Sequence, residues 1–289
     1  MSERADILEN REPLMGVRHS VFDRYRDSTL RLLYRWAIII AYVGLMAPLV
    51  IVIVASFSKK RFFDFPPSLD SLGVLSYTQL IQHAELKRSL LLSVELAVTT
   101  MVVTMVISAL AAYAIDRFRF PGRTQVELVL MAPLILPPSV LAIAVLVFIS
   151  TVKIDPSFWI LAGAHVLITI PFALRVMLAA LAGFDRSMEE ASASLGARPL
   201  QTIRRVTIPM LQPGFLAAGI FAFVISFGNV TVSVFLSSAG SGTPAPVAMF
   251  AASEYSYEVT ITALAVVMMV VAFSVIGVVE RVTGLERVF

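Results

Sequence analysis

Residues 183–214 read GFDRSMEEASASLGARPLQTIRRVTIPMLQPG and form the most polar internal stretch of the chain. The sequence on both sides of this stretch is apolar. Residues 157–182 contain one charged residue, Arg175, and no charged residue occurs from Met210 to Ser253. A helix needs roughly 20 apolar residues to cross the ~30 Å hydrocarbon core of a bilayer. The polar stretch is therefore predicted to connect two membrane-spanning helices.

The composition of the whole chain indicates a membrane protein. Hydrophobic residues make up 58% and charged residues 15% of the 289 residues, whereas soluble proteins average ~45–50% and ~25%. So few polar side chains cannot cover a water-exposed surface of this size. There is no cysteine, which excludes disulfides, thiolate metal sites and cysteine nucleophiles. The first 30 residues contain no apolar segment of the signal-peptide kind, so no cleaved leader is expected.

Six apolar segments are long enough to cross the membrane as helices. Such runs are too long and continuous for β-barrel strands, and backbone groups in lipid must be hydrogen-bonded within their own segment. The fold class is therefore predicted to be all-α integral membrane. The fifth segment is expected to end where the turn-forming sequence SSAGSGTPAP begins at residue 237. The expected spans are 37–57, 89–115, 128–152, 157–182, 213–236 and 259–279.

Basic residues predict the orientation, because lysine and arginine are concentrated in cytoplasmic segments. With the N-terminus inside, 17 of the 23 Lys and Arg residues lie on the cytoplasmic side. We therefore expect a cytoplasmic segment over 1–35, a transmembrane domain over 36–280, a cytoplasmic loop over 183–212 and a cytoplasmic tail over 281–289. Residues 21–36 carry apolar side chains on one helical face, which predicts an amphipathic helix along the inner membrane surface. The alternative is a cytosolic helix that packs on a partner.

The polar loop has the local signals of two short helices joined by a tight turn. Ser187 stands three residues before Glu190, the spacing of a capping box at a helix start. Gly196 suits the left-handed position that ends such a helix. Pro199 fits the first position of a second helix, which Pro209 is expected to stop.

Here the sequence resembles a known family. Permease subunits of binding-protein-dependent ABC importers carry a cytoplasmic motif of Glu-Ala-Ala, three residues, Gly, nine residues, and then Ile-x-Leu-Pro. In this chain the motif reads Glu190, Ala191 and Ser192, then Gly196, then Val206, Thr207, Ile208 and Pro209. The departures are Ser for the second Ala, Val for Ile and Ile for Leu, all of similar size. The alternative interpretation is an ordinary amphipathic loop hairpin.

The resemblance implies the type I importer permease fold, with six transmembrane helices and a cytoplasmic coupling helix. In such importers this hairpin docks in a groove of the ATPase subunit and moves with it. The role of pairing with a basic residue of the ATPase would fall to Glu190, with Ala191 and Ser192 beside it. Gly196 would permit the turn, while Val206, Ile208 and Pro209 would anchor the hairpin under the fifth span.

The resemblance also implies a set of partners in the bacterial inner membrane. These are two ATPase subunits, which bind ATP and magnesium, a second permease subunit, expected to be a paralogue, and an extracytoplasmic binding protein. The chain itself is expected to hold no cofactor, to contact the lipid bilayer and to bind no nucleic acid.

Further segments resemble the polyamine-type branch of these permeases. They are RFRFPGR at 117–123, LMAPLILPPSVLAIAV at 130–145, FPPSLDS at 65–71 and SFGNVTVSVFLSSAG at 226–240. The expected solute is therefore a polyamine or a similar organic cation. The branch also includes transporters for ferric iron, thiamine and phosphonates, so these stay open. Many polyamine permeases have an acidic residue in the fifth span where this chain has Gly228 and Asn229, which weakens the cation interpretation.

Polar residues within spans are costly and are candidates for function. Counted at 1.5 Å per residue, Glu95, His165 and Asn229 fall at about the same depth in the outer half of the bilayer. We therefore predict that they line a translocation path. The alternative is that neighbouring helices satisfy each of them. Prolines 133, 137 and 138 interrupt the third span and mark either a kink or a gate.

Other classes of protein fit the sequence less well. The three histidines form no HExxH zinc motif, and no lysine is followed by Ser or Thr as a phosphate-binding loop requires. The chain is therefore expected to contain no catalytic residue and no metal site, and ATP hydrolysis is assigned to a separate subunit. A stand-alone secondary transporter would also use intramembrane carboxylates, but it does not explain the cytoplasmic motif.

Overall fold

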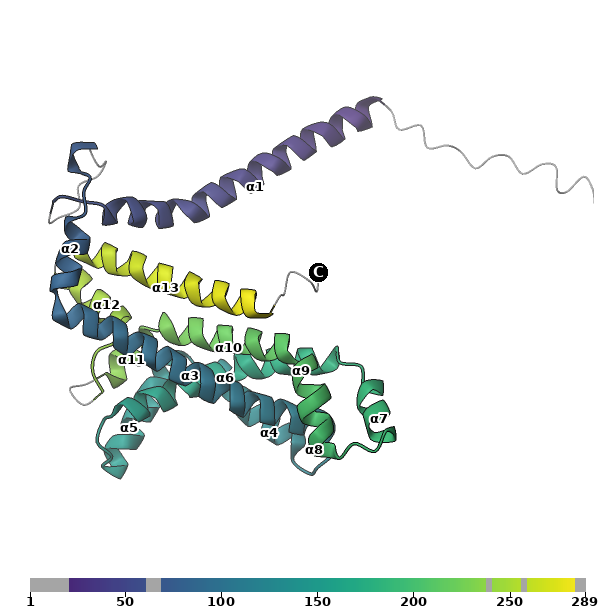
Figure 1. Ribbon diagram of the computed structural model, residues 1–289. Helices are drawn as coiled ribbons and strands as arrows, with labels where there is room; N and C mark the ends of the chain where they lie inside the picture. The colour runs from purple at the N-terminus through teal and green to yellow at the C-terminus, as the bar shows by residue number, and fades with distance from the viewer. Residues whose placement is uncertain (1–20, 61–68, 238–240, 256–258, 284–289) are drawn as a thin grey trace, which may run out of the picture. The chain divides into compact units, whose positions relative to one another are not determined.

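The computed structural model of the chain describes residues 21–60, 69–237, 241–255 and 259–283. Every regular element in these ranges is a helix (Figure 1), which confirms the predicted all-α fold class. The chain divides into two units, residues 1–51 and 52–289, and each is described by itself.

The described part of the first unit is helical. Helix α1 (Val21–Ser56) begins in this unit and ends in the second, and its apolar part, residues 30–56, is long enough to cross a membrane. No glycine or proline occurs between Val21 and Gly44, so no residue of this kind separates the helix predicted over 21–36 from the span that follows it. The helix predicted over 21–36 is therefore the first part of α1 and not a separate element.

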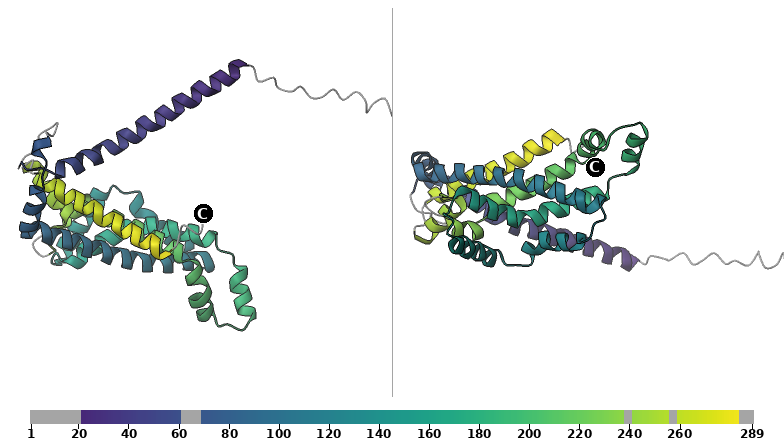
Figure 2. Two further views of the ribbon diagram at one scale, coloured as in Figure 1. Left: turned by 45° about the horizontal axis from the view of Figure 1, so that its top comes forward. Right: turned by 90° about the horizontal axis from the view of Figure 1, so that it is seen from below.

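Three long helices lie side by side at the centre of the second unit (Figures 1 and 2): α3 (Ala84–Arg117), α6 (Phe158–Ala182) and α10 (Gln212–Phe227). On α3 the buried side chains are mostly small, and they recur every three or four residues. They include Ser93, Ala97, Thr100, Thr104, Ser108 and Ala112. Small residues on one face let helix backbones approach closely, which is how helices associate in lipid. Helix α13 (Thr260–Thr283) packs against α10 and against the short helix α2 (Leu75–Gln82).

The third expected span is sharply bent. Helix α4 (Arg123–Met131) and the 3-10 turn η2 (Ala132–Leu134) are followed by α5 (Pro138–Val152), and the two parts meet at 104°. Proline lacks an N–H and disfavours helix in the residue before it, and Pro133 and Pro137 flank the bend. The span expected over 128–152, which the prolines were predicted to interrupt, therefore consists of two helices.

The fifth expected span is also broken. Helix α10 ends at Phe227, and a second helix, α11 (Thr231–Leu236), follows after three residues. The Asn229 side chain accepts a 2.8 Å hydrogen bond from the Val232 N–H and so satisfies a free donor at the start of α11. Beyond the next loop lies α12 (Ala245–Tyr255).

Within the described residues, four helices are long and apolar enough to cross a membrane. The number is up to six if each of two bent pairs, residues 123–134 with 138–152 and residues 199–210 with 212–227, is one span. Six is the number that the sequence predicts. Two of the buried apolar clusters lie among these central helices. One joins α3, α5, α6 and α11 around Leu96, Leu161 and Val232, and the other joins α3, α6 and α10 around Leu174 and Met177. The second cluster includes Leu211, which belongs to the polar loop.

Candidate functional site: the polar hairpin and the buried polar residues

The polar loop forms a hairpin, defined here as residues 185–211, that projects from one end of the second unit (Figure 2). Its first arm is α7 (Ser187–Ser194). Its second arm is a continuous helical stretch made of α8 (Pro199–Thr202), the π-helical turn η3 (Ile203–Thr207) and α9 (Ile208–Met210).

The first arm is capped by Asp185, not by Ser187. The Asp185 Oδ1 atom accepts a 2.9 Å hydrogen bond from the Ser187 N–H, and hydrogen bonds from Ser187 lower the pKa of this carboxyl. Ser187 is itself the first residue of α7, so the predicted capping box between Ser187 and Glu190 is wrong. An aspartate two residues earlier fills the same need, because its carboxylate accepts from an otherwise free N–H at the helix start.

The turn at Gly196 is confirmed. Gly196 has φ +82°, its N–H bonds to the Ala193 carbonyl at 2.9 Å, and the next N–H, of Ala197, bonds to the Ser192 carbonyl at 3.2 Å. This pair of bonds is the Schellman arrangement, which ends a helix with one left-handed residue. Glycine is favoured here because other residues are strained at positive φ.

The second arm begins at Pro199 as predicted, but it does not stop at Pro209. The π-helical turn η3 leads directly into α9, which contains Pro209. The helix continues to Met210 and meets α10 at a bend of 65°. The expected stop at Pro209 is therefore wrong, and the bend lies at Leu211.

Several motif side chains face away from the rest of the protein. Glu190 and Ala191 are exposed, and Ile208 and Pro209 are exposed as well. Val206 is half-buried, and Ser192 is hydrogen-bonded across the hairpin to Thr202 at 3.0 Å. The motif is therefore divided between an outward face at Glu190 and contacts that tie the two arms together.

Two large apolar residues at the hairpin tip were not among the functional residues predicted from the sequence. Leu195 is 89% exposed and Leu200 is 75% exposed, one on each side of the Gly196 turn. Exposed leucines at the end of a projecting hairpin are typical of a surface that a partner covers. Their position beside the turn glycine was the signal available in the sequence.

Glu189 was also missed, and it lies at the base of the hairpin. Its Oε1 atom accepts a 2.6 Å hydrogen bond from the Thr207 hydroxyl, and its Oε2 atom lies 3.2 Å from Nη2 of Arg117, the last residue of α3. Arg117 also pairs with Asp116 at 2.9 Å, and Arg186 reaches the same Asp116 carboxylate at 3.0 Å. No sequence signal could have identified these contacts, because the partners are far apart along the chain.

The structure places the three polar residues expected to line a path in three different environments. His165 is fully buried, Asn229 is half-buried and caps α11, and Glu95 is exposed on α3. The ring of His165 contacts two serine hydroxyls, Ser226 at Nδ1 (2.8 Å) and Ser233 at Nε2 (3.0 Å). Both ring nitrogens of His165 are therefore hydrogen-bonded to neighbouring helices, as in the alternative to a path-lining role.

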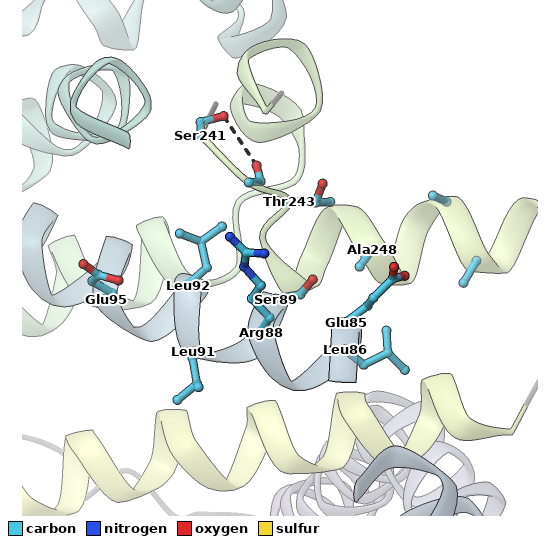
Figure 3. Close-up of a pocket in the computed structure, with 13 residues that line it drawn as sticks. Glu85, Leu86, Arg88, Ser89, Leu91, Leu92, Glu95, Ser241, Thr243 and Ala248 are labelled. Atoms are coloured by element: carbon cyan, nitrogen blue, oxygen red, sulfur yellow. Dashed lines mark hydrogen bonds between the residues drawn. The ribbon is translucent and has the colours of Figure 1, made fainter. Parts of the chain in front are cut away.

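Glu95 lines a cavity of about 850 Å³ between the first turns of α3 and the segment from Ser241 into α12 (Figure 3). Glu85 and Arg88 line it from the same helix, and Thr243 lines it from the opposite side. The cavity thus presents two carboxylates, one guanidinium and several hydroxyls. Such a mixture suits a polar or charged ligand, or a polar loop of a partner.

Comparisons with known proteins agree with this geometry. The family described as "Binding-protein-dependent transport system inner membrane component" matches residues 104–283. The spermidine/putrescine transport system permease protein PotC of Haemophilus influenzae is 28% identical over 244 residues, which are 84% of this chain and 93% of PotC. The putrescine transport system permease protein PotI of Escherichia coli is 25% identical over 240 residues, which are 80% of this chain and 84% of PotI.

A solved structure agrees in fold. The crystal structure of a bacterial ABC transporter involved in the import of the acidic polysaccharide alginate contains a chain that matches with a TM-score of 0.70. The sequence identity is 17%, and the match covers 90% of this chain and 96% of the other. At this level of identity the likeness concerns the fold.

Proposed function

We infer the function from one premise: this chain belongs to the family of binding-protein-dependent transport system inner membrane components, and it is a permease of an ABC importer. Such a permease is a multi-pass protein of the bacterial inner membrane. Beyond this premise, we propose that it translocates a small solute that an extracytoplasmic binding protein delivers. ATP hydrolysis in separate subunits drives the cycle, so this chain is a membrane-spanning subunit and not an enzyme.

The hairpin is the observation that carries the proposal. Its exposed tip, with Leu195 and Leu200 beside the Gly196 turn, has the form of a small apolar knob. The exposed Glu190 adds a carboxylate for a basic residue of the partner. A few well-packed residues usually carry most of the binding energy of a protein interface. The partner at this surface is an ATPase subunit, which binds ATP and magnesium.

The remaining partners follow from the mode of action of an importer. Two ATPase subunits require two hairpins, and a second permease subunit, a paralogue of this chain, supplies the other. The hairpin faces the cytoplasm, and with six spans both termini lie on the same side as the hairpin. The bias of basic residues supports this orientation.

The solute we propose is a polyamine or a similar organic cation. The support is that PotC and PotI are named as permeases for spermidine and putrescine, and that two carboxylates, Glu85 and Glu95, line the cavity of Figure 3. Ferric iron, thiamine and phosphonates are the alternatives within the same machinery. Among the candidates for the path, Glu95 is open to a solute, whereas His165 and Asn229 are engaged by neighbouring backbone or side chains.

The test of the coupling role is retention of the ATPase. The tagged chain is purified from membranes that contain the other subunits, and the amount of ATPase subunit retained is measured. Leu195→Glu places a charge at the apolar tip and is expected to lower retention by roughly tenfold or more. Thr124→Glu adds the same charge to an exposed position of α4 outside the hairpin and should retain the ATPase normally. Equal retention in both variants, or uptake by the purified chain alone, would contradict the proposal.

The test of the solute class is the ligand retained by the binding protein. Binding of spermidine, putrescine, thiamine, ferric iron and a phosphonate to that protein is measured by calorimetry. A polyamine that binds, and whose half-saturation concentration for uptake rises in Glu95→Gln, supports the cation proposal. Binding of ferric iron, thiamine or a phosphonate instead overturns the solute class but leaves the coupling role intact.

A further inference from the structure

The carboxylate of Glu189 contacts two elements outside its own helix. One oxygen accepts the hydroxyl of Thr207, in the η3 turn that leads to α9 and the fifth span. The other oxygen pairs with Arg117, at the end of α3. A single side chain of the first arm is therefore bonded both to the second arm and to a membrane-spanning helix.

Arg117 is held in a fixed place. Its side chain is 9% exposed, and its guanidinium carbon lies 5.9 Å from the ring centre of Tyr113 and 5.5 Å from that of Phe184. Contacts of this kind with two aromatic rings are attractive and restrict the side chain. The partner of Glu189 is thus a well-packed group, unlike the flexible pairs of an open protein surface, which contribute little.

The two adjacent glutamates of α7, Glu189 and Glu190, point in different directions. Glu189 faces inward with its side chain 19% exposed, whereas Glu190 is exposed to solvent. Successive residues of a helix point about 100° apart, as 3.6 residues per turn require. One carboxylate is therefore available to a partner protein, and the adjacent one binds within the chain.

Not every N–H group of the Arg117 side chain has a hydrogen-bond acceptor. Its Nε and Nη2 atoms are buried without a hydrogen-bond acceptor in the described residues, and the Nη2 contact with Glu189 is an ion pair only. Asp116 is shared between Arg117 and the more exposed Arg186. Buried donors without acceptors are costly, so loss of the Glu189 carboxylate would remove one of the few groups that compensate the buried guanidinium.

We propose that Glu189 is a positioning residue that fastens the hairpin to Arg117 of α3 and to Thr207. Movement of the hairpin is thereby passed to the second and fifth spans together. This inference rests on the proposed function, because it assigns the path by which force from the ATPase enters the membrane domain. Glu190 receives that force at the surface, and Glu189 transmits it inward.

The first test measures distances inside the full complex. The chain has no native cysteine, so Ala193→Cys on α7 and Arg119→Cys just beyond α3 carry spin labels at exposed positions. In the otherwise unchanged chain, the distance between the labels is expected to stay constant between the nucleotide-free and ATP–vanadate states. With Glu189→Gln added, the distance should shift by more than the width of the unchanged distribution. Glu190→Gln, the matched control on the same helix, should leave the distance constant.

The second test measures coupling. In proteoliposomes that contain the complex and its binding protein, Glu189→Gln is expected to lower the stimulation of ATPase activity by the loaded binding protein roughly tenfold. The ATPase subunits should stay bound. Arg123→Gln, which removes an exposed guanidinium at the same end of the protein, should couple normally.

Exchange of the two charges separates transmission from a general loss of stability. Arg117→Glu and Glu189→Arg are each expected to uncouple, or to fail to assemble, and the double exchange R117E/E189R should recover coupling relative to both. A constant label distance and normal stimulation in Glu189→Gln would overturn the inference. So would a double exchange no better than the single changes. Failure of the proposed function is distinguishable, because no ATPase subunit would then be retained by the unchanged chain.

Discussion

The Nε2 atom of His165 lies 3.0 Å from the hydroxyl oxygen of Ser233, and this contact joins α6 to the far side of the break between α10 and α11. The Nδ1 atom of the same ring lies 2.8 Å from Ser226, near the end of α10. A neutral imidazole has one donor and one acceptor nitrogen, so one serine accepts and the other donates. A single side chain therefore bridges both parts of the interrupted fifth span.

His165→Ala is expected to destabilise the purified complex by about 2–5 kcal/mol, the usual cost of truncating a large buried side chain. The change opens a cavity and removes one hydrogen-bond partner from each of two buried hydroxyls, of which Ser226 keeps its bond to Thr100. Thermal unfolding in detergent measures the effect. Ser150→Ala is the control, because the exposed Ser150 hydroxyl bonds only to its own helix, at the Leu146 carbonyl. An unchanged melting temperature in His165→Ala would contradict the bridging role.

A second polar contact joins α3 and α6. The hydroxyl groups of Thr104 and Thr169 lie 2.7 Å apart in a fully buried interface. Side-chain hydrogen bonds between membrane helices contribute about 0.6 kcal/mol on average and up to about 1.7. A double-mutant cycle with Thr104→Val and Thr169→Val is expected to give a coupling energy in this range. A coupling energy of zero would show that the two hydroxyls do not stabilise the packing of α3 on α6.

Features set by neighbouring residues could be predicted from the sequence. The apolar runs predict helices that span a membrane. The turn at Gly196 and the start of α8 at Pro199 were predicted because both depend on backbone preferences within a few residues. The capping residue was missed by two positions, since Ser187 and Asp185 are equally good acceptors at a helix start.

Long-range contacts could not be predicted in the same way. Counting along the helices placed Glu95 and His165 at similar depth, but depth does not say in which direction a side chain points around its helix. Their directions differ, since Glu95 is exposed and His165 is buried. The contact between Arg117 and Glu189 joins residues far apart in the chain, and only the packing of α3 beneath the hairpin brings them together.

The cap at Asp185 predicts how the hairpin responds to pH. Hydrogen bonds from Ser187 lower the pKa of the Asp185 carboxyl below its ordinary value of 3.8. A carboxyl whose pKa is lowered on folding stabilises the folded state above its unfolded pKa, and that stabilisation is lost as the pH falls through the lower value. Protection of the α7 amides from hydrogen exchange, corrected for intrinsic rates, should therefore be constant between pH 5 and 8. Asp185→Ala should lower it throughout that range, and pH-dependent protection within it would contradict the assignment.

Gly196→Val is expected to uncouple the transporter without a steric clash. A Cβ atom at this position would meet nothing within 4 Å, but φ is +82°. A left-handed conformation costs a residue with a Cβ roughly 1–2 kcal/mol, and β-branching adds to that cost. The turn is expected to change its conformation to relieve this strain. Leu195 and Leu200 then move apart, and the apolar surface that the ATPase binds is lost. Two measurements report the loss: retention of the ATPase, and stimulation of its activity by the loaded binding protein. Gly196→Asn, which tolerates positive φ better, should retain more activity.

The control is Gly163→Ala on α6, where the added Cβ also meets nothing and φ is helical. Normal stimulation in Gly196→Val would show that the shape of the turn does not matter for coupling.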